Sequence, residues 1–232
     1  MQRFHILFVT LLVTICACSS RIPSVHVIKI VIATGDGHNI EADLFEPVGG
    51  GMETVLIAGY GNDSEKEQWT SFAGKIAERK YSVLLTPLHD DSSWSGFAAA
   101  IHYFRQNARF TDGGIIIIGA EAGGNAAMEV AIRDTSIAAV IAMTPMLSFR
   151  QDRLKDRVRL LRGRPLLLIA SEGDTVAPAA EIEKIYDAAE SPEKLVWLAS
   201  DERGVLLLSS DLEPVIRRVC LLFMEKFDSK NE

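Results

Sequence analysis

The stretch that decides the fold reads Ile115-Ile116-Ile117-Ile118-Gly119-Ala120-Glu121-Ala122-Gly123-Gly124-Asn125-Ala126-Ala127-Met128. Its four consecutive isoleucines suit a strand buried on both faces, because β-branched side chains pack well inside a parallel sheet. The alanine-rich residues after Gly124 have the composition of a helix. A sharp turn must join the two, and Gly119, Gly123 and Gly124 permit the close approach that it needs. We therefore predict a strand, a tight turn centred on Glu121, and a helix.

Segments of these two kinds alternate along most of the chain. Apolar, β-branched runs predict strands, and apolar residues spaced three and four apart predict helices. A leading hairpin is expected over 25–32 and 40–45. Later strands are expected over 54–58, 81–85, 138–143, 165–170 and 194–198, and helices over 65–80, 96–108, 125–133, 179–189 and 212–227. This order predicts an α/β protein with a mostly parallel sheet and helices on both faces.

The turn around Glu121 is similar to the nucleophile elbow of α/β-hydrolases, whose pattern is G-x-S-x-G. The resemblance covers residues 25–227 and implies the α/β-hydrolase fold, with about eight strands, in the manner of dienelactone hydrolases and serine esterases or peptidases. At 232 residues and 48% hydrophobic composition, residues 19–232 are expected to form a single domain. Glu121 stands where the family carries its serine.

The resemblance also assigns an acid position and a base position. Asp174, in Ser171-Glu172-Gly173-Asp174 after an apolar strand, falls at the acid position. Arg203, followed by Gly204, stands where the family commonly has a His-Gly pair. A guanidinium group has no free lone pair near neutral pH and cannot act as a general base. Classical serine hydrolase activity is therefore not expected, and no metal or other cofactor is expected either.

The backbone donors of an oxyanion hole would survive these changes. The resemblance implies that they are the N–H groups of Ala122 and of Tyr60 in Gly59-Tyr60-Gly61, although Ala58 stands where relatives often carry His. We also expect Glu121 to have a positive φ angle, as the centre of such a turn. Two carboxylates at one site repel each other, so we expect Arg203 to form ion pairs with both Glu121 and Asp174.

The first residues have a different character. Residues 1–18 read as a signal peptide of lipoprotein type, because an apolar stretch follows Arg3 and ends at Ile15-Cys16-Ala17-Cys18, which resembles the bacterial lipobox. We expect Cys18 to be lipidated and the protein to be exported and anchored in a membrane, on the periplasmic or cell-surface side. An ordinary secretory signal and a short buried helix are the alternatives. Cys220 then remains as a thiol within the apolar pattern of the last helix.

The net charge of −7 argues against nucleic-acid binding. A basic exception lies at residues 148–164, the usual position of the lid in this fold, and contains Arg150, Arg153 and Arg157. One interpretation is a solvated helix with its own ion pairs. The other is a surface for an anionic partner, such as membrane headgroups.

Two functional hypotheses remain. The first is a lipid-anchored α/β-hydrolase-fold protein that has lost hydrolase chemistry and acts as a binding or scaffolding module for a small molecule or a protein. The second is an active hydrolase that uses Glu121 as a carboxylate nucleophile, as haloalkane dehalogenases use Asp. Such an enzyme would need an imidazole, and His89 is the best candidate because its loop should open at the same edge of the sheet.

Overall fold

A computed structural model describes residues 24–35, 37–52, 54–88, 94–107, 113–149, 152–190 and 192–228. Cys18, His89 and Arg150 lie outside the described residues, so the predictions that concern them are not addressed by the structure. Within the described ranges, none of the helices is long and apolar enough to cross a membrane.

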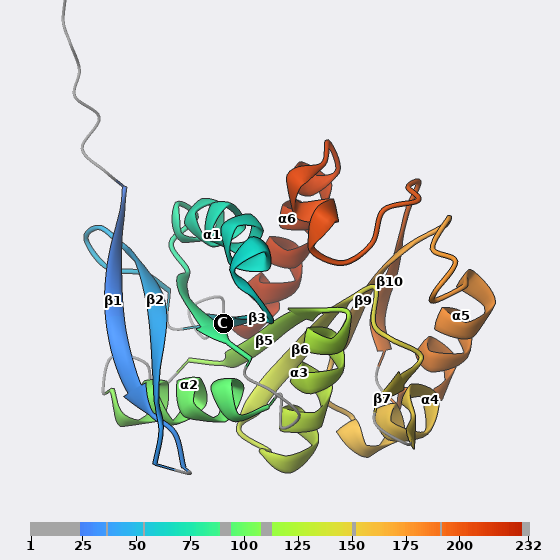
Figure 1. The fold of residues 1–232 in the computed structure, drawn as a ribbon, viewed down its shortest axis with the longest axis horizontal. Coiled ribbons are helices and arrows are strands. Elements are labelled where there is room, and N and C mark those ends of the chain that lie inside the picture. The colour runs from blue at the N-terminus through green and yellow to red at the C-terminus, as the bar shows by residue number, and fades with distance from the viewer. Residues whose placement is uncertain are drawn as a thin grey trace, which may run out of the picture.

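The core of the protein is an eight-stranded sheet (Figure 1). Its strands are β1 (Val25–Ala33), β2 (Asn39–Pro47), β3 (Val55–Tyr60), β4 (Ser82–Pro87), β5 (Ile115–Ala120), β6 (Ile137–Met143), β9 (Leu166–Ser171) and β10 (Pro192–Leu198). They lie in the order β1-β2-β4-β3-β5-β6-β9-β10. Only β2 runs antiparallel to both of its neighbours, and the other pairings are parallel. The predicted hairpin and mostly parallel sheet are therefore confirmed.

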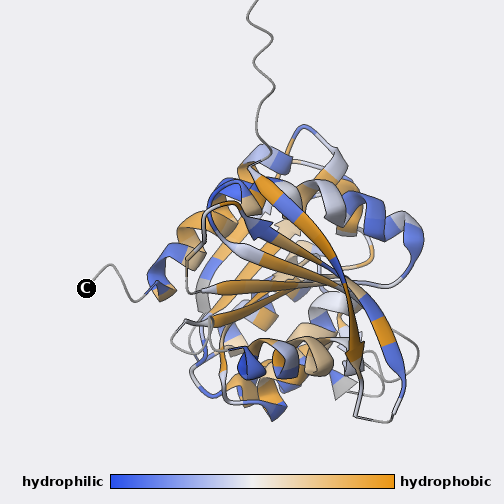
Figure 2. Ribbon diagram, turned by 90° about the vertical axis from the view of Figure 1, so that its left-hand side faces the viewer, coloured by the Kyte–Doolittle hydropathy of each residue, from blue (hydrophilic) through white to orange (hydrophobic). Residues whose placement is uncertain are grey.

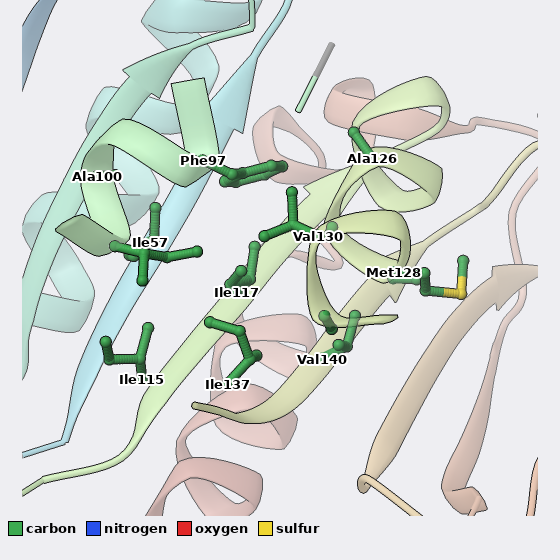
Figure 3. Packing of buried hydrophobic residues seen from close by; sticks show 14 of the residues in the cluster. Ile57, Phe97, Ala100, Ile115, Ile117, Ala126, Met128, Val130, Ile137 and Val140 are labelled. Carbon is green, nitrogen blue, oxygen red and sulfur yellow. The ribbon is translucent and has the colours of Figure 1, made fainter. Parts of the chain in front are cut away.

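The isoleucine strand β5 lies in the middle of this sheet, between β3 and β6. Ile116, Ile117 and Ile118 have no exposed surface, which explains why the strand needs β-branched residues on both faces. Figure 3 shows Ile117 packing with Phe97 of α2 (Ser95–Gln106) and Val130 of α3 (Ala122–Arg133).

Helices cover both faces of the sheet, whose strands are predominantly hydrophobic (Figure 2). One face packs against α1 (Asp63–Ala77) and α6 (Glu213–Met224) through Trp69, Phe72 and Phe223. The other face packs against α2, α3 and α5 (Ala179–Ala188). The predicted helices are present, but the first ends at Ala77 and not at Lys80, because Lys80 has a φ of 75° and cannot continue it.

The basic segment between β6 and β9 has structure that the sequence did not predict. It contains the short pair β7 (Ser148–Phe149) and β8 (Asp152–Arg153), then α4 (Leu154–Arg157) and the 3-10 helix η2 (Val158–Leu161). Leu154, Val158 and Leu161 are buried in the core beside α3 and α5. The segment therefore runs along the helical layer and returns to the start of β9.

Two further 3-10 helices complete the chain. They are η3 (Gly204–Ser209), which leads from the loop after β10 toward α6, and η4 (Glu225–Phe227), which follows α6. Because β3, β5, β6, β9 and β10 are parallel, the loops that follow them meet at one edge of the sheet. That carboxyl edge holds the candidate site.

Candidate functional site

The turn between β5 and α3 has the geometry expected of a strained elbow. Glu121 has φ 50° and ψ −118°, which confirms the predicted positive φ. A Cβ atom on Gly119 would lie 2.2 Å from the Gly123 carbonyl oxygen, so only glycine fits at that position. The Glu121 N–H donates to Met143 O at 2.9 Å, which ties the elbow to the neighbouring strand β6. This turn therefore presents Glu121 at the carboxyl edge of the sheet.

Arg203 joins the two carboxylates of the site. Its Nη1 lies 3.1 Å from Glu121 Oε1, and its Nε lies 3.2 Å from Asp174 Oδ2. The predicted pair of ion bridges is therefore present. The Asp174 side chain is 2% exposed and the Glu121 side chain is 36% exposed, so the arrangement is closed on the aspartate side and open on the glutamate side.

Asp174 has more support than its ion pair. Its Oδ1 accepts hydrogen bonds from the backbone N–H groups of Val176, at 2.8 Å, and Ala177, at 3.0 Å. These bonds form a local turn that fixes the direction of the carboxylate after β9. With Arg203 on the other oxygen, both oxygens of this buried carboxylate have partners, as a buried charge requires.

Gly204 allows the Arg203 loop to approach the elbow. It has a φ of 60°, and a Cβ atom there would lie 2.6 Å from Glu121 Oε2. Its N–H donates to Thr144 Oγ1 at 2.7 Å. Ser171 Oγ donates to Glu202 O at 2.5 Å, which fixes the same loop from β9. The position of Arg203 is therefore determined by contacts with the ends of β5, β6 and β9.

Sequence reasoning missed Thr144 and Ser171, and it also missed Asn125. Asn125 is buried in α3, accepts from Met146 N at 3.1 Å, and donates to Met146 O at 3.0 Å, so it holds the loop after β6. Thr144 and Ser171 could have been found from the sequence, because each is a hydroxyl residue at the end of an apolar strand. Sites in this fold lie at those strand ends.

The two residues expected to supply an oxyanion hole lie at the same edge. Ala122 is the first residue of α3, and Tyr60 is the last residue of β3, which pairs with β5 up to Ala58 and Ile118. The Tyr60 side chain is buried, and burial raises the pKa of its phenol, although nearby Lys66 opposes this shift. The next N–H along the chain, that of Gly61, donates to Glu65 Oε2 at 2.8 Å. The role of Tyr60 and Ala122 as donors stays a prediction.

The described histidines belong to other parts of the molecule. His26 lies in β1, His38 follows the turn before β2, and His102 lies in α2 with Nε2 at 2.8 Å from Gln106 Nε2. Within the described ranges, no group of three His, Cys, Asp or Glu residues is arranged to hold a metal ion. The polar chemistry that the described residues bring to this site is therefore that of carboxylates, a guanidinium group, hydroxyls and backbone amides.

An arginine of the basic segment binds a carboxylate within the protein. Arg157 forms an ion pair with Glu129 of α3, and Arg133 binds the same carboxylate at 2.7 Å. Burial favours a higher pKa for Glu129, but the hydrogen bonds from both arginines outweigh it and lower the pKa. Arg153 differs, since it is exposed and lines a cavity of about 360 Å³ together with Lys155 and Glu181.

No protein-family model and no curated protein sequence matches this chain. Solved structures do match. The esterase domain of a Rhodothermus marinus protein shares 18% identity at a TM-score of 0.60 over 83% of this chain and 99% of that one. An esterase from Pyrococcus furiosus shares 14% at a TM-score of 0.72, over 89% and 93% of the two chains. Dienelactone hydrolase from Anabaena variabilis shares 17% at a TM-score of 0.72, over 88% and 99%. The chain therefore has the α/β-hydrolase fold.

Proposed function

We propose that this protein is an α/β-hydrolase-fold binding module that has lost serine hydrolase chemistry. The residues at its catalytic positions, Glu121, Asp174 and Arg203, instead form two ion pairs, which we call the ionic lock. In this proposal Glu121, Asp174 and Arg203 take the places of the nucleophile, the acid and the base of a hydrolase. The observation that carries the proposal is the position of the Arg203 guanidinium between the two carboxylates, at 3.1 Å and 3.2 Å.

The chemistry of these groups argues against acyl transfer. A guanidinium group has no free lone pair to accept a proton, so Arg203 cannot act as a general base toward a nucleophile or water. Glu121 is a weaker nucleophile toward esters than an activated alkoxide, and its ion pair with Arg203 withdraws electron density from the attacking oxygen. What remains is an exposed polar site with fixed geometry, which suits binding better than turnover.

The proposal includes export and a lipid anchor at Cys18, supported by the residues around Ile15-Cys16-Ala17-Cys18. Mass spectrometry of the mature N-terminus tests this part. An acylated Cys18 is the expected result, and cleavage at Ser20 or later contradicts it.

The proposal also includes an anionic partner that binds the basic segment. Among the described residues, Arg153 is its main contact, because Arg153 is exposed whereas Arg157 already binds Glu129.

Ester turnover tests the loss of chemistry. The protein is incubated with p-nitrophenyl acetate and p-nitrophenyl butyrate beside a Glu121→Gln variant, which keeps the size of the side chain and removes its charge. We expect no turnover above the buffer rate by either protein. Turnover that Glu121→Gln abolishes would contradict the proposal, and would support Glu121 as a carboxylate nucleophile.

A further inference from the structure

Large apolar side chains are exposed around the ionic lock. Met146, Val176 and Leu206 are each more than a third exposed, and each belongs to a different loop at the carboxyl edge. Exposed apolar residues are ordinary when scattered, but a group of them around a polar site marks a surface that another molecule covers.

Hydrogen bonds and one close approach bring the backbone segments of these three residues to the edge that holds the ionic lock. The Val176 N–H binds Asp174 Oδ1, and Arg203 binds the other oxygen of that carboxylate. Leu206 belongs to η3, whose first residue, Gly204, lies against the Glu121 side chain. Met146 follows Thr144 by two residues, and Thr144 Oγ1 accepts from Gly204 N. Val176 and Leu206 are thus at most two residues from a group that contacts the lock, and Met146 is two residues from Thr144, which binds Gly204.

The same loops carry a strong excess of negative charge. Glu172, Asp201 and Glu202 are exposed, and the two loops that hold them are joined by a hydrogen bond from Gly173 N to Ser200 O at 3.0 Å. Together with Glu121 and Asp174 they make five acidic residues. In the described loops after β5, β6, β9 and β10, Arg203 is the only basic residue. An apolar surface with this charge attracts a cationic partner and repels an anionic one.

We propose that this surface, formed by Met146, Val176 and Leu206 with Glu172, Asp201 and Glu202, docks a segment of a partner protein that presents lysine or arginine beside large apolar side chains. The inference rests on the proposed function, since it names a partner for the edge of the binding module that holds the ionic lock, in addition to the anionic partner proposed for the basic segment. Apolar contacts with the three exposed residues supply affinity, and the acidic residues select the sign of the partner's charge. Binding then weakens as salt screens the acidic loops.

A synthetic amphipathic peptide of leucine and lysine tests the surface, with a leucine and glutamate peptide of the same pattern as its comparison. Leu206→Ser should weaken binding of the leucine and lysine peptide by about tenfold. The matched control is Leu222→Ser on α6, because Leu222 is 48% exposed and Leu206 is 55% exposed. Glu202→Gln should weaken binding at low salt, whereas Glu67→Gln, an exposed position on α1, should leave it unchanged.

Equal binding of the two peptides, or equal effects of Leu206→Ser and Leu222→Ser, would overturn the docking surface. Self-association of the protein that Leu206→Ser abolishes would overturn it as well, because a second copy would then be the occupant. None of these three results would affect the proposed loss of hydrolase chemistry, because ester turnover tests that loss separately.

Discussion

Gly204 lies so close to Glu121 that a single added carbon would collide with the glutamate: a Cβ atom at position 204 would be 2.6 Å from Glu121 Oε2 and 2.7 Å from its Cδ. Gly204 also has a φ of 60°, which disfavours any other residue. The glycine after Arg203 therefore allows the arginine loop to approach the elbow closely. A substitution at position 204 should change the effect of a substitution at position 121, and the reverse.

Gly204→Ala should destabilise the protein by about 1 to 3 kcal/mol, mainly through the strained φ, because the Glu121 carboxylate that the added Cβ would meet ends a flexible side chain. Urea unfolding of Gly204→Ala, of Glu121→Gly and of the double variant separates the two causes. In the double variant the collision is removed, so its loss should be smaller than the sum of the single losses. Strict additivity would show that the contact between positions 204 and 121 has no energetic effect.

Glu121→Gly should leave the free energy of unfolding unchanged or slightly raised. Glycine relieves a strained backbone that costs about 1 to 3 kcal/mol, whereas a half-exposed ion pair contributes at most about 1 kcal/mol. Chemical denaturation measures the difference. A large loss of stability would show that the Glu121 carboxylate holds the loops together.

Arg203→Met should cost about 1 to 3 kcal/mol, less than the 3 to 5 kcal/mol typical of a broken buried pair. The reason is that Asp174 keeps the N–H donors of Val176 and Ala177, while Glu121 can turn to solvent. Thermal unfolding of Arg203→Met and of Arg203→Lys measures the effect, and the lysine variant should recover part of it. No loss in Arg203→Met would contradict the lock.

Acid should destabilise the protein through Glu129, whose pKa is lowered in the folded state from its ordinary value of 4.5. Because the folded pKa is depressed, this contribution is fully present above the unfolded pKa. It is lost as the pH falls through the folded pKa, that is, below about 4.5. Stability measured between pH 7 and pH 3 should fall less steeply in Glu129→Gln, although that variant starts less stable at pH 7. Parallel pH profiles would rule out this role.

Cys220 should resist thiol reagents in the native protein, because the side chain is fully buried and burial raises its pKa to about 12. Labelling with iodoacetamide should follow unfolding in urea. Rapid labelling under native conditions would show that α6 opens readily.

The elbow could be predicted because it depends on local sequence, and the ion bridges could be predicted because the hydrolase resemblance assigns Glu121, Asp174 and Arg203 to one site. The glycines around Glu121 permit one kind of turn, and the two carboxylates that follow β5 and β9 at the same edge of the sheet require a cation, which Arg203 supplies. The hydrogen bonds of Thr144, Ser171 and Asn125 could not be predicted, because each joins loops that are distant in sequence.

The basic segment shows a second limit of the sequence. Its arginines suggested a solvated helix or a basic surface for an anionic partner, but Leu154, Val158 and Leu161 bury one side of the segment, and Arg157 pairs with Glu129. Glu129 reads as an ordinary helix residue until α3 places its carboxylate beside two arginines. Partners of this kind follow from packing and not from spacing along the chain.

Reconstruction of a triad tests the central claim most directly. The protein, the Glu121→Ser variant and the Glu121→Ser, Arg203→His double variant are treated with a fluorophosphonate probe, and the labelled residue is located by mass spectrometry. The lock predicts no labelling of the natural protein, little labelling of the single variant and clear labelling of Ser at position 121 in the double variant, where His can bind Asp174. Labelling of the natural protein, or a folded double variant that stays unlabelled, would contradict the account.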